Sequence, residues 1–271
     1  MIPKILHYCW FGKGLMPKSQ IDCIKTWKKV MPDYQIIRWD ESNFDAGLCS
    51  FSKWSLQERI YSPVSDVCRY YALNRFGGIY LDTDVEVFQR FDEFLTADFF
   101  SAIELYKEFY TEGLPLLDSE GNPKTPGTEI PHLEMLTSTI GCAPENILIK
   151  ECLDYYMSIE ADAQYVREYR KHINNDRLVA KFATQYGFRY KDELQLLSNN
   201  MVVYPTGIFG YKHCVNPQYS VSYHHNAASW GSRTKMQQFF ILLDKLHLLK
   251  LYQRYQSSKK KIKSLWQINH Q

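Results

Sequence analysis

The sequence predicts an α/β protein built on one central, mostly parallel sheet. Within the first 90 residues, three apolar strand patterns alternate with helical patterns, an order typical of parallel strands joined by crossover helices. Hydrophobic residues make up 45% of the 271 residues and aromatic residues 15%, which is enough to bury a sizeable core. The length permits one large domain or two small ones, and the composition excludes a disordered chain.

Apolar spacing and chain-breaking residues place these first elements. Residues 19–31 carry apolar side chains at helical spacing, and Pro32 follows where that pattern stops. A second helix is expected from Pro63, in its first turn, to about Phe76, where Gly77-Gly78 ends it. The strands of this region are expected over 4–11, 34–39 and 78–82.

The middle of the chain is expected to hold further strands and helices around a long loop. Residues 111–131 are rich in Gly, Pro, Thr and Glu and are predicted to form a loop over the site. Strands are expected over 98–104, 137–142, 194–197 and 201–204, and helices over 144–160 and 175–186.

A basic segment follows an acidic body. From Arg233 onward the chain has nine Lys/Arg and one Asp, whereas the residues before it have 23 basic and 29 acidic side chains. We expect a folded domain over 1–232 and a basic helical tail over 233–271 that packs on it through the apolar stretch 239–252. The Lys-rich run 259–263 is either a solvated end or an attraction to anionic lipid, and we favour peripheral membrane contact.

The sequence does not favour secretion, a membrane span or a nucleic-acid partner. Seven cysteines occur singly, which is typical of reduced thiols in the cytoplasm. The first twelve residues lack a signal-peptide pattern, and no apolar run reaches the ~20 residues of a membrane span. No nucleic-acid-binding motif accompanies the basic segment, so nucleic acid is not an expected partner. We therefore expect a cytoplasmic protein that can lie at the inner face of the membrane.

Two carboxylates stand at the end of the third strand pattern, in GIYLDTDVEVF. Asp82 and Asp84 would point to the same side if the extended conformation continued. Such close carboxylates repel one another unless a cation lies between them, and oxygen ligands suit Mg²⁺ or Mn²⁺. The end of a parallel strand is also where α/β folds bind ligands. A solvated turn is the alternative, and we favour a metal site.

Three more stretches carry candidate side chains. Asp66 and Arg69 share a face of the second helix, where they form either a surface ion pair or a polar face toward a sugar or phosphate. The stretch HYCWFG, residues 7–12, contains aromatic side chains that either stack on a planar ring or belong to the core. The stretch YHHNAASW, residues 223–230, contains a His pair that either closes a metal site or is structural.

In this order, these stretches resemble the DXD sugar transferases of glycosyltransferase family 32. The resemblance rests on PKILHYCWFG, PDYQIIRW, SDVCRYYALNRFGGIYLDTDVEV and HHNAASW, and it covers about residues 2–232. That family includes bacterial capsule and lipopolysaccharide enzymes and yeast mannosyltransferases. More distantly, the chain is similar to the glucosyltransferase domains of large clostridial toxins.

The resemblance implies a GT-A fold, a single nucleotide-binding domain. It implies that Trp10, with His7 nearby, contacts a nucleotide-sugar through its uracil or guanine base. Asp66 and Arg69 would hold the donor sugar, with Asp82 divided between sugar and metal. The implied ligands of Mn²⁺ or Mg²⁺ are Asp82, Asp84 and His225, with His224 a weaker candidate than His225. Ser229 and Trp230 would complete the contacts with the diphosphate.

The sequence therefore predicts a metal-dependent retaining glycosyltransferase. Its donor would be a nucleotide-sugar, a UDP-sugar by preference, and its acceptor a glycan or lipid-linked glycan in bacterial surface polysaccharide assembly. The alternatives are a nucleotide-sugar or glycan-binding module without transfer and a DxD phosphatase of the haloacid dehalogenase type. Glu86 stands where that phosphatase family requires Thr or Val, which makes it the weaker alternative.

Overall fold

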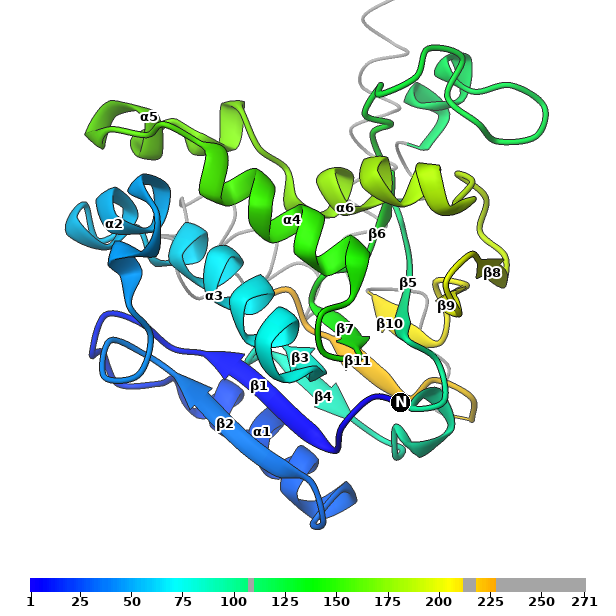
Figure 1. The fold of residues 1–271 in the computed structure, drawn as a ribbon. Helices are drawn as coiled ribbons and strands as arrows, with labels where there is room; N and C mark the ends of the chain where they lie inside the picture. Colours follow the sequence, from blue (N-terminus) through cyan, green and yellow to red (C-terminus); the bar gives the residue numbers. More distant parts are fainter. Residues whose placement is uncertain (107–109, 212–217, 228–271) are drawn as a thin grey trace, which may run out of the picture. The chain divides into compact units, whose positions relative to one another are not determined.

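The computed structural model describes residues 1–106, 110–211 and 218–227. The expected basic tail over 233–271 and the candidates Ser229 and Trp230 lie outside these residues. In the described part, a central sheet lies between helices, so the predicted α/β class is confirmed (Figure 1). No helix among the described residues is long and apolar enough to cross a membrane. The cysteines of this part of the chain are all free thiols.

The central sheet has the order β2-β1-β3-β7-β5-β9-β8, with β6 paired to β5. β1 is parallel to β2 and β3, and β5 is parallel to β9. β7 lies between β3 and β5 and is antiparallel to both, so the sheet is mixed although most strands along this order run in one direction. The strands are β1 (Ile5–Cys9), β2 (Gln35–Trp39), β3 (Gly78–Leu81), β5 (Phe99–Leu105), β6 (Leu133–Met135), β7 (Thr139–Cys142), β8 (Gln195–Leu197) and β9 (Met201–Tyr204).

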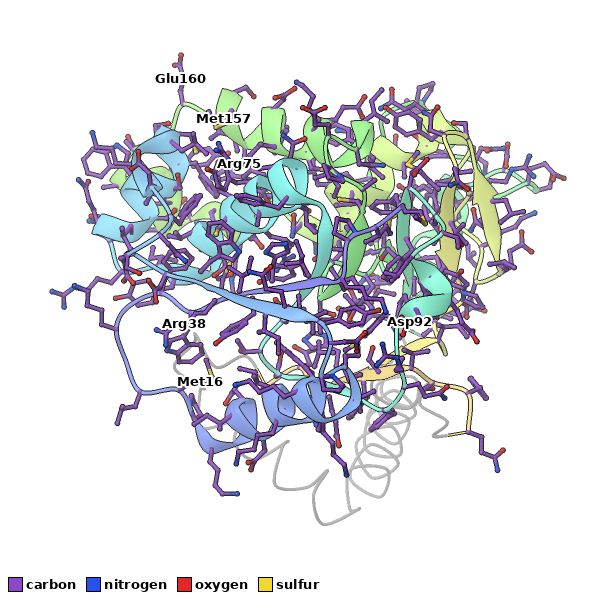
Figure 2. The ribbon with its side chains drawn as sticks, turned by 60° about the horizontal axis from the view of Figure 1, so that its bottom comes forward. Met16, Arg38, Arg75, Asp92, Met157 and Glu160 are labelled. Carbon is purple, nitrogen blue, oxygen red and sulfur yellow. The ribbon has the colours of Figure 1, made fainter. Side chains whose placement is uncertain are left out.

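Helices cover both faces of this sheet. Figure 2 shows α1, near the labelled Met16, on one side of the strands, and α3 and α4, which carry Arg75 and Met157, on the other. The helices predicted over 19–31, 63–76, 144–160 and 175–186 are confirmed within a few residues, and the last of these four continues past Ala183 as a 3₁₀ turn to Tyr186. The helices are α1 (Lys18–Val30), α2 (Ser50–Gln57), α3 (Tyr61–Phe76), α4 (Ile147–Ser158), α5 (Ala163–Arg167) and α6 (Asn175–Ala183).

Strand β3 places its side chains alternately in two cores. Ile79 and Leu81 pack in the core on the side of α1, which includes Trp27, whereas Tyr80 packs in the core on the side of α3. All three β3 side chains are at most 2% exposed. Because alternate residues of a strand share a face, the position after Leu81 points back toward α3.

The connection from α3 to β3 depends on two glycines. Gly77 has a φ of +61° with a ψ of −162°, and Gly78 has a φ of +101°, conformations that strain any residue with a side chain. A Cβ on Gly78 would lie 2.7 Å from the carbonyl oxygen of Ile5 in β1. The Gly-Gly pair therefore lets β3 pack closely on β1 directly after the helix ends.

The structure also contains a second, three-stranded sheet, which the sequence analysis did not predict. It has the order β10-β11-β4 and consists of β4 (Val85–Val87), β10 (Phe209–Tyr211) and β11 (Ser222–His224). These strands have three residues each, too few to show an alternating pattern. The short strand β6 and the one-turn helix α5 were missed for the same reason. The pairing of β11 with β4 brings the end of the described chain beside Asp84.

Candidate active site

The candidate site lies where β1 and β3 end. These strands are parallel, so Trp10 after β1 and Asp82 after β3 come to the same edge of the sheet. The chain does not stay extended through the two aspartates. It turns, and the N–H of Val85 donates to the carbonyl oxygen of Asp82 over 3.0 Å. The two carboxylates therefore approach one another through a turn and not along one face of a strand.

Asp82 and Asp84 meet His224 in a compact group. His224 Nε2 lies 3.3 Å from Asp84 Oδ1 and 4.0 Å from Asp82 Oδ2. One potential ligand atom from each of the three residues lies within 4.8 Å of the others. The backbone N–H of Ala227 also donates to Asp84 Oδ2, over 2.5 Å. The last residue of β11 and the segment after it therefore both contact Asp84.

The prediction preferred His225 as the metal ligand, but the structure places His224 beside the aspartates. Neighbouring residues of an extended segment point to opposite sides, so the two rings separate. His225 lies with Tyr223, 4.6 Å between ring centroids, and its Nε2 is 3.0 Å from Glu86 Oε2. The sequence contained both histidines, and only the register of β11 against β4 distinguishes them.

The electrostatics of this group follow from burial and pairing. Burial alone raises the pKa of Asp84, but the hydrogen bond and charge of His224 and the Ala227 N–H bring that pKa below its usual value. Burial lowers the pKa of His224, but the hydrogen bond to Asp84 and the charges of Asp84, Asp82 and Asp176 together raise it above its usual value. Burial raises the pKa of Asp82, against the charge of Arg69. Asp84 is therefore ionised at neutral pH and suited to bind a cation.

Arg69 links the DXD aspartates to helix α3. Its Nη2 donates to Asp82 Oδ1 over 3.1 Å and lies 3.5 Å from Asp66 Oδ1. Its guanidinium carbon is 4.3 Å from the centre of the Tyr80 ring, whose hydroxyl donates to Asp82 over 3.0 Å. The Arg69 side chain is only 6% exposed, compared with 14% for Asp66 and 30% for Asp82. Arg69 therefore holds the two carboxylates, and the carboxylates reach the surface of the site.

Asp66 has a further partner that the sequence interpretation missed. Asn175 Nδ2, at the start of α6, donates to Asp66 Oδ1 over 3.2 Å. Burial raises the pKa of Asp66 to about 7, although Arg69 acts in the opposite direction. The sequence around Asn175 showed only the polar residues that begin a helix, which is why it was not singled out.

His7 is a core residue and does not face a ligand. It is fully buried, its Nε2 donates to the carbonyl oxygen of Gly77 over 2.8 Å, and its Nδ1 accepts from Trp39 Nε1 over 3.1 Å. These two bonds require a neutral ring, and burial lowers the pKa of His7 to about 4. The predicted contact between His7 and a nucleotide is therefore corrected, and the core alternative holds for this residue.

Trp10 remains a candidate for base stacking. Its side chain is half-buried, and its Nε1 donates to the carbonyl oxygen of Gly14 over 2.8 Å. This bond fixes the ring beside the loop that follows β1. Ser229 and Trp230, expected to contact the diphosphate, lie outside the described residues and stay predictions.

A second acidic group lies beyond Asn175. Glu104 of β5, Glu134 of β6 and Asp176 of α6 each have a carboxylate oxygen within 4.8 Å of the others. Arg177 Nε donates to Glu134 over 2.7 Å, and Thr137 Oγ1 donates to Asp176 over 2.5 Å. The two glutamates are at most 3% exposed, so this group is largely closed to solvent.

The stretch that contains Asp82 and Asp84 matches a known protein family. Residues 17–100 match the family described as the glycosyltransferase sugar-binding region containing a DXD motif. These residues are similar to the sugar-binding region of DXD glycosyltransferases. The DXD region runs from α1 to the start of β5 and includes Asp66, Arg69, Asp82 and Asp84. The resemblance to DXD sugar transferases is confirmed for this region, whereas Asn175 and His224 lie outside it.

One curated relative also matches in this part of the chain. The chain is 32% identical over 88 residues to inositol phosphoceramide mannosyltransferase 3 of Schizosaccharomyces pombe. The match covers 31% of this chain and 24% of that relative. The chain thus spans about a quarter of the relative's length.

Three solved glycosyltransferases are similar in structure. The PaToxG glycosyltransferase has 17% identity and a TM-score of 0.42, and the match covers 68% of this chain and 69% of that one. A glycosyltransferase involved in glycosylation of the major capsid of PBCV-1 has 9% identity and a TM-score of 0.44, with coverage of 83% and 95%. The galactosyltransferase LgtC has 10% identity and a TM-score of 0.39, with coverage of 83% and 88%.

Proposed function

We propose that this chain is a metal-dependent glycosyltransferase of the GT-A kind. It transfers a sugar from a nucleotide-sugar, a UDP-sugar by preference, to a glycan or lipid-linked acceptor. The observation that carries the proposal is the group of Asp82, Asp84 and His224 beside Arg69 and Asp66, four of which belong to the matched DXD region. The resemblance to family 32 supports retention of the anomeric configuration and a role in bacterial surface polysaccharide assembly.

The three donor atoms fit a hard divalent cation. Two carboxylates and one imidazole are ligands that Mn²⁺ accepts, and Mg²⁺ accepts the carboxylates. When bound by Asp82, Asp84 and His224, such a cation would neutralise the negative charge that grows on the leaving diphosphate. The N–H of Ala227 donates to Asp84 Oδ2 and would help to hold this carboxylate in place.

In this proposal, the protein's own residues orient the sugar. Arg69 holds Asp66 and Asp82 from the buried side, so their exposed faces point to the site in fixed positions. Carboxylates accept hydrogen bonds from sugar hydroxyls, and their charge favours the oxocarbenium character that the sugar gains as its bond to the diphosphate breaks. Trp10 is half-buried at the same edge of the sheet and can stack on the base.

The test is metal-dependent hydrolysis of a panel of UDP- and GDP-sugars. Asp84→Asn should reduce the hydrolysis rate about 100-fold or more, because it removes a charged ligand for the leaving-group cation. A chelator should abolish the wild-type rate. The matched control is Asp154→Asn, which changes a 58% exposed carboxylate on α4 and should leave the rate unchanged.

Two results would contradict the proposal. One is an Asp84→Asn variant that turns over donor at the wild-type rate with metal chelated. The other is a wild-type protein that binds UDP and Mn²⁺ in calorimetry but hydrolyses none of the donors, which would favour a binding module without transfer.

We also propose that the protein acts in the cytoplasm at an anionic membrane surface. The support is the composition from Arg233 onward, with nine basic residues and one acidic residue, where each basic residue near such a surface contributes about 1 kcal/mol. Removal of residues 257–271 should weaken binding to vesicles that contain phosphatidylserine, and binding to neutral vesicles should stay low. Unchanged binding to the anionic vesicles would contradict this proposal.

A further inference from the structure

Every hydrogen-bonding position of the Asn175 amide is occupied by a protein group. Its Oδ1 accepts from the hydroxyls of Tyr70, over 2.6 Å, and Tyr156, over 3.1 Å. Its Nδ2 donates to Asp66 Oδ1 and to Thr137 Oγ1, each over 3.2 Å. A primary amide accepts two hydrogen bonds and donates two. Asn175 is therefore saturated before any ligand arrives.

These partners also fix which way the amide faces. The rings of Tyr70 and Tyr156 are fully buried and stacked, with centroids 5.8 Å apart. Tyr70 belongs to α3 and Tyr156 to α4. The packing of these two helices against α6 therefore determines the direction in which Oδ1 of Asn175 points. Rotation of the amide by half a turn would break the two hydrogen bonds that Oδ1 accepts and the one that Nδ2 donates to Asp66. Of the candidate sugar-binding carboxylates, Asp66 is therefore the one that accepts a hydrogen bond from Asn175 Nδ2.

The contact determines the orientation of Asp66. The bond from Asn175 and the approach of Arg69 both reach Asp66 Oδ1, from α6 and from α3. A carboxylate held at one oxygen from two directions has a defined plane. The two contacts on Oδ1 therefore hold the Asp66 side chain in one orientation.

We propose that Asn175 is a positioning residue, which orients Asp66 toward the donor sugar and acts only through Asp66. The inference rests on the proposed function, because it takes Asp66 to bind that sugar. It differs from a direct contact between Asn175 and the sugar, for which the amide has no remaining position. It predicts that Asn175 matters for the sugar part of the donor and not for the nucleoside diphosphate.

The test compares binding of UDP-sugars and GDP-sugars with binding of free UDP and GDP, all with Mn²⁺, by calorimetry. For the sugar nucleotide that wild type binds most tightly, Asn175→Ala should weaken binding about tenfold, and binding of the free diphosphate should not change. Asn175→Asp should lose the same sugar-specific binding, because it keeps an acceptor for both tyrosines and loses the donor toward Asp66. This second variant keeps the test valid if Asn175→Ala leaves the tyrosine hydroxyls unpaired and unfolds.

A double-mutant cycle decides whether Asn175 acts through Asp66. In an Asp66→Ala background, Asn175→Ala should have no further effect on sugar-nucleotide binding. The matched control is Asn174→Ala, which removes the side chain that caps α6 through the N–H of Arg177. That variant should lower the melting temperature but leave the ratio of sugar-nucleotide to diphosphate affinity unchanged.

The outcomes separate this inference from the proposed function. An undiminished effect of Asn175→Ala in the Asp66→Ala background, or equal losses for sugar nucleotide and free diphosphate, would overturn the inference and leave the proposed function intact. A wild-type protein that binds no sugar nucleotide would overturn the proposed function and the inference with it.

Discussion

The two adjacent histidines illustrate how far a single residue can be assigned from sequence. His224 and His225 are the same residue type at neighbouring positions, yet the ring of His224 contacts Asp84 and the ring of His225 contacts Glu86. The alternation of an extended chain separates them. The residue types of the candidate metal site were therefore predictable, and the choice between two neighbours was not.

The first prediction is that His224→Ala weakens Mn²⁺ binding and His225→Ala does not. His224 contributes one of three donor atoms, so its loss should reduce Mn²⁺ affinity about tenfold or more. His225 is 41% exposed and faces Glu86, so its variant is the control with an affinity near that of wild type. Calorimetric titration of Mn²⁺ into each variant measures both, and a larger loss for His225→Ala would contradict the assignment.

The second prediction concerns the buried neutral ring of His7. Its pKa in the folded protein is lowered to about 4 from the usual 6.5. Between these values the unfolded chain binds a proton that the folded chain does not. The contribution of His7 to stability is therefore complete above pH 6.5 and is lost as pH falls toward 4, by about 3 kcal/mol.

Urea unfolding between pH 4 and 7 measures this loss. His7→Gln should flatten the decrease in unfolding free energy over that range. His172→Gln, which changes an exposed ring, should retain the wild-type slope. Equal slopes for wild type and His7→Gln would show that another group causes the decrease.

At the scale of elements, the turn between α3 and β3 positions the DXD carboxylates. The sequence identified the helix, its Gly-Gly end and the strand that follows, because each has a strong local signal. The three-residue strands β4 and β11 have no such signal, and their pairing brings His224 to Asp84. The half of the site carried by α3 and β3 was thus predictable, and the half carried by β11 was not.

The third prediction is that Gly78→Ala is destabilising. The variant places a Cβ 2.7 Å from the backbone oxygen of Ile5, at a φ of +101°. Backbone strain of this kind costs about 1–3 kcal/mol, and relief requires β3 to move away from β1. Gly14→Ala is the control, because a Cβ there meets no atom within 4 Å. Urea denaturation should show the loss only for Gly78→Ala, and equal stability of the two variants would contradict the account.

At the scale of the whole domain, a hydrogen bond joins Asp66, which Arg69 links to the DXD aspartates, to a residue about 100 positions further along the chain. Asn175 of α6 contacts Asp66 of α3 and Thr137 before β7, and Thr137 contacts Asp176. The same arrangement places Asp176 near Glu104 of β5 and Glu134 of the paired strand β6. Sequence patterns did not indicate this second acidic group, because its members come from three separate elements.

The fourth prediction is that Glu104→Gln stabilises the protein at neutral and alkaline pH. Burial, with the nearby charges of Asp176 and Glu134, raises the pKa of Glu104 well above 4.5. The unfolded chain releases this proton near pH 4.5 and the folded chain retains it, so wild-type stability falls as pH rises above 4.5. Glutamine has no proton to release and avoids that loss.

Melting temperatures at pH 5 and pH 8 provide the measurement. The advantage of Glu104→Gln over wild type should be larger at pH 8, by a few degrees. Glu93→Gln, which changes an exposed carboxylate, should give no advantage at either pH. A destabilised Glu104→Gln variant at pH 8 would show that the charged form is required.

The sequence by itself determined the α/β class, the order of the first elements and the stretch that carries the DXD aspartates, because these features depend on local periodicity and turn residues. The tertiary structure alone decided that His7 belongs to the core, that His224 joins the aspartates and that Asn175 holds Asp66. Those outcomes depend on strand register and on contacts between residues far apart in the chain. Such contacts leave no local pattern, since many residue types satisfy the same local spacing and only the packed fold selects their partners.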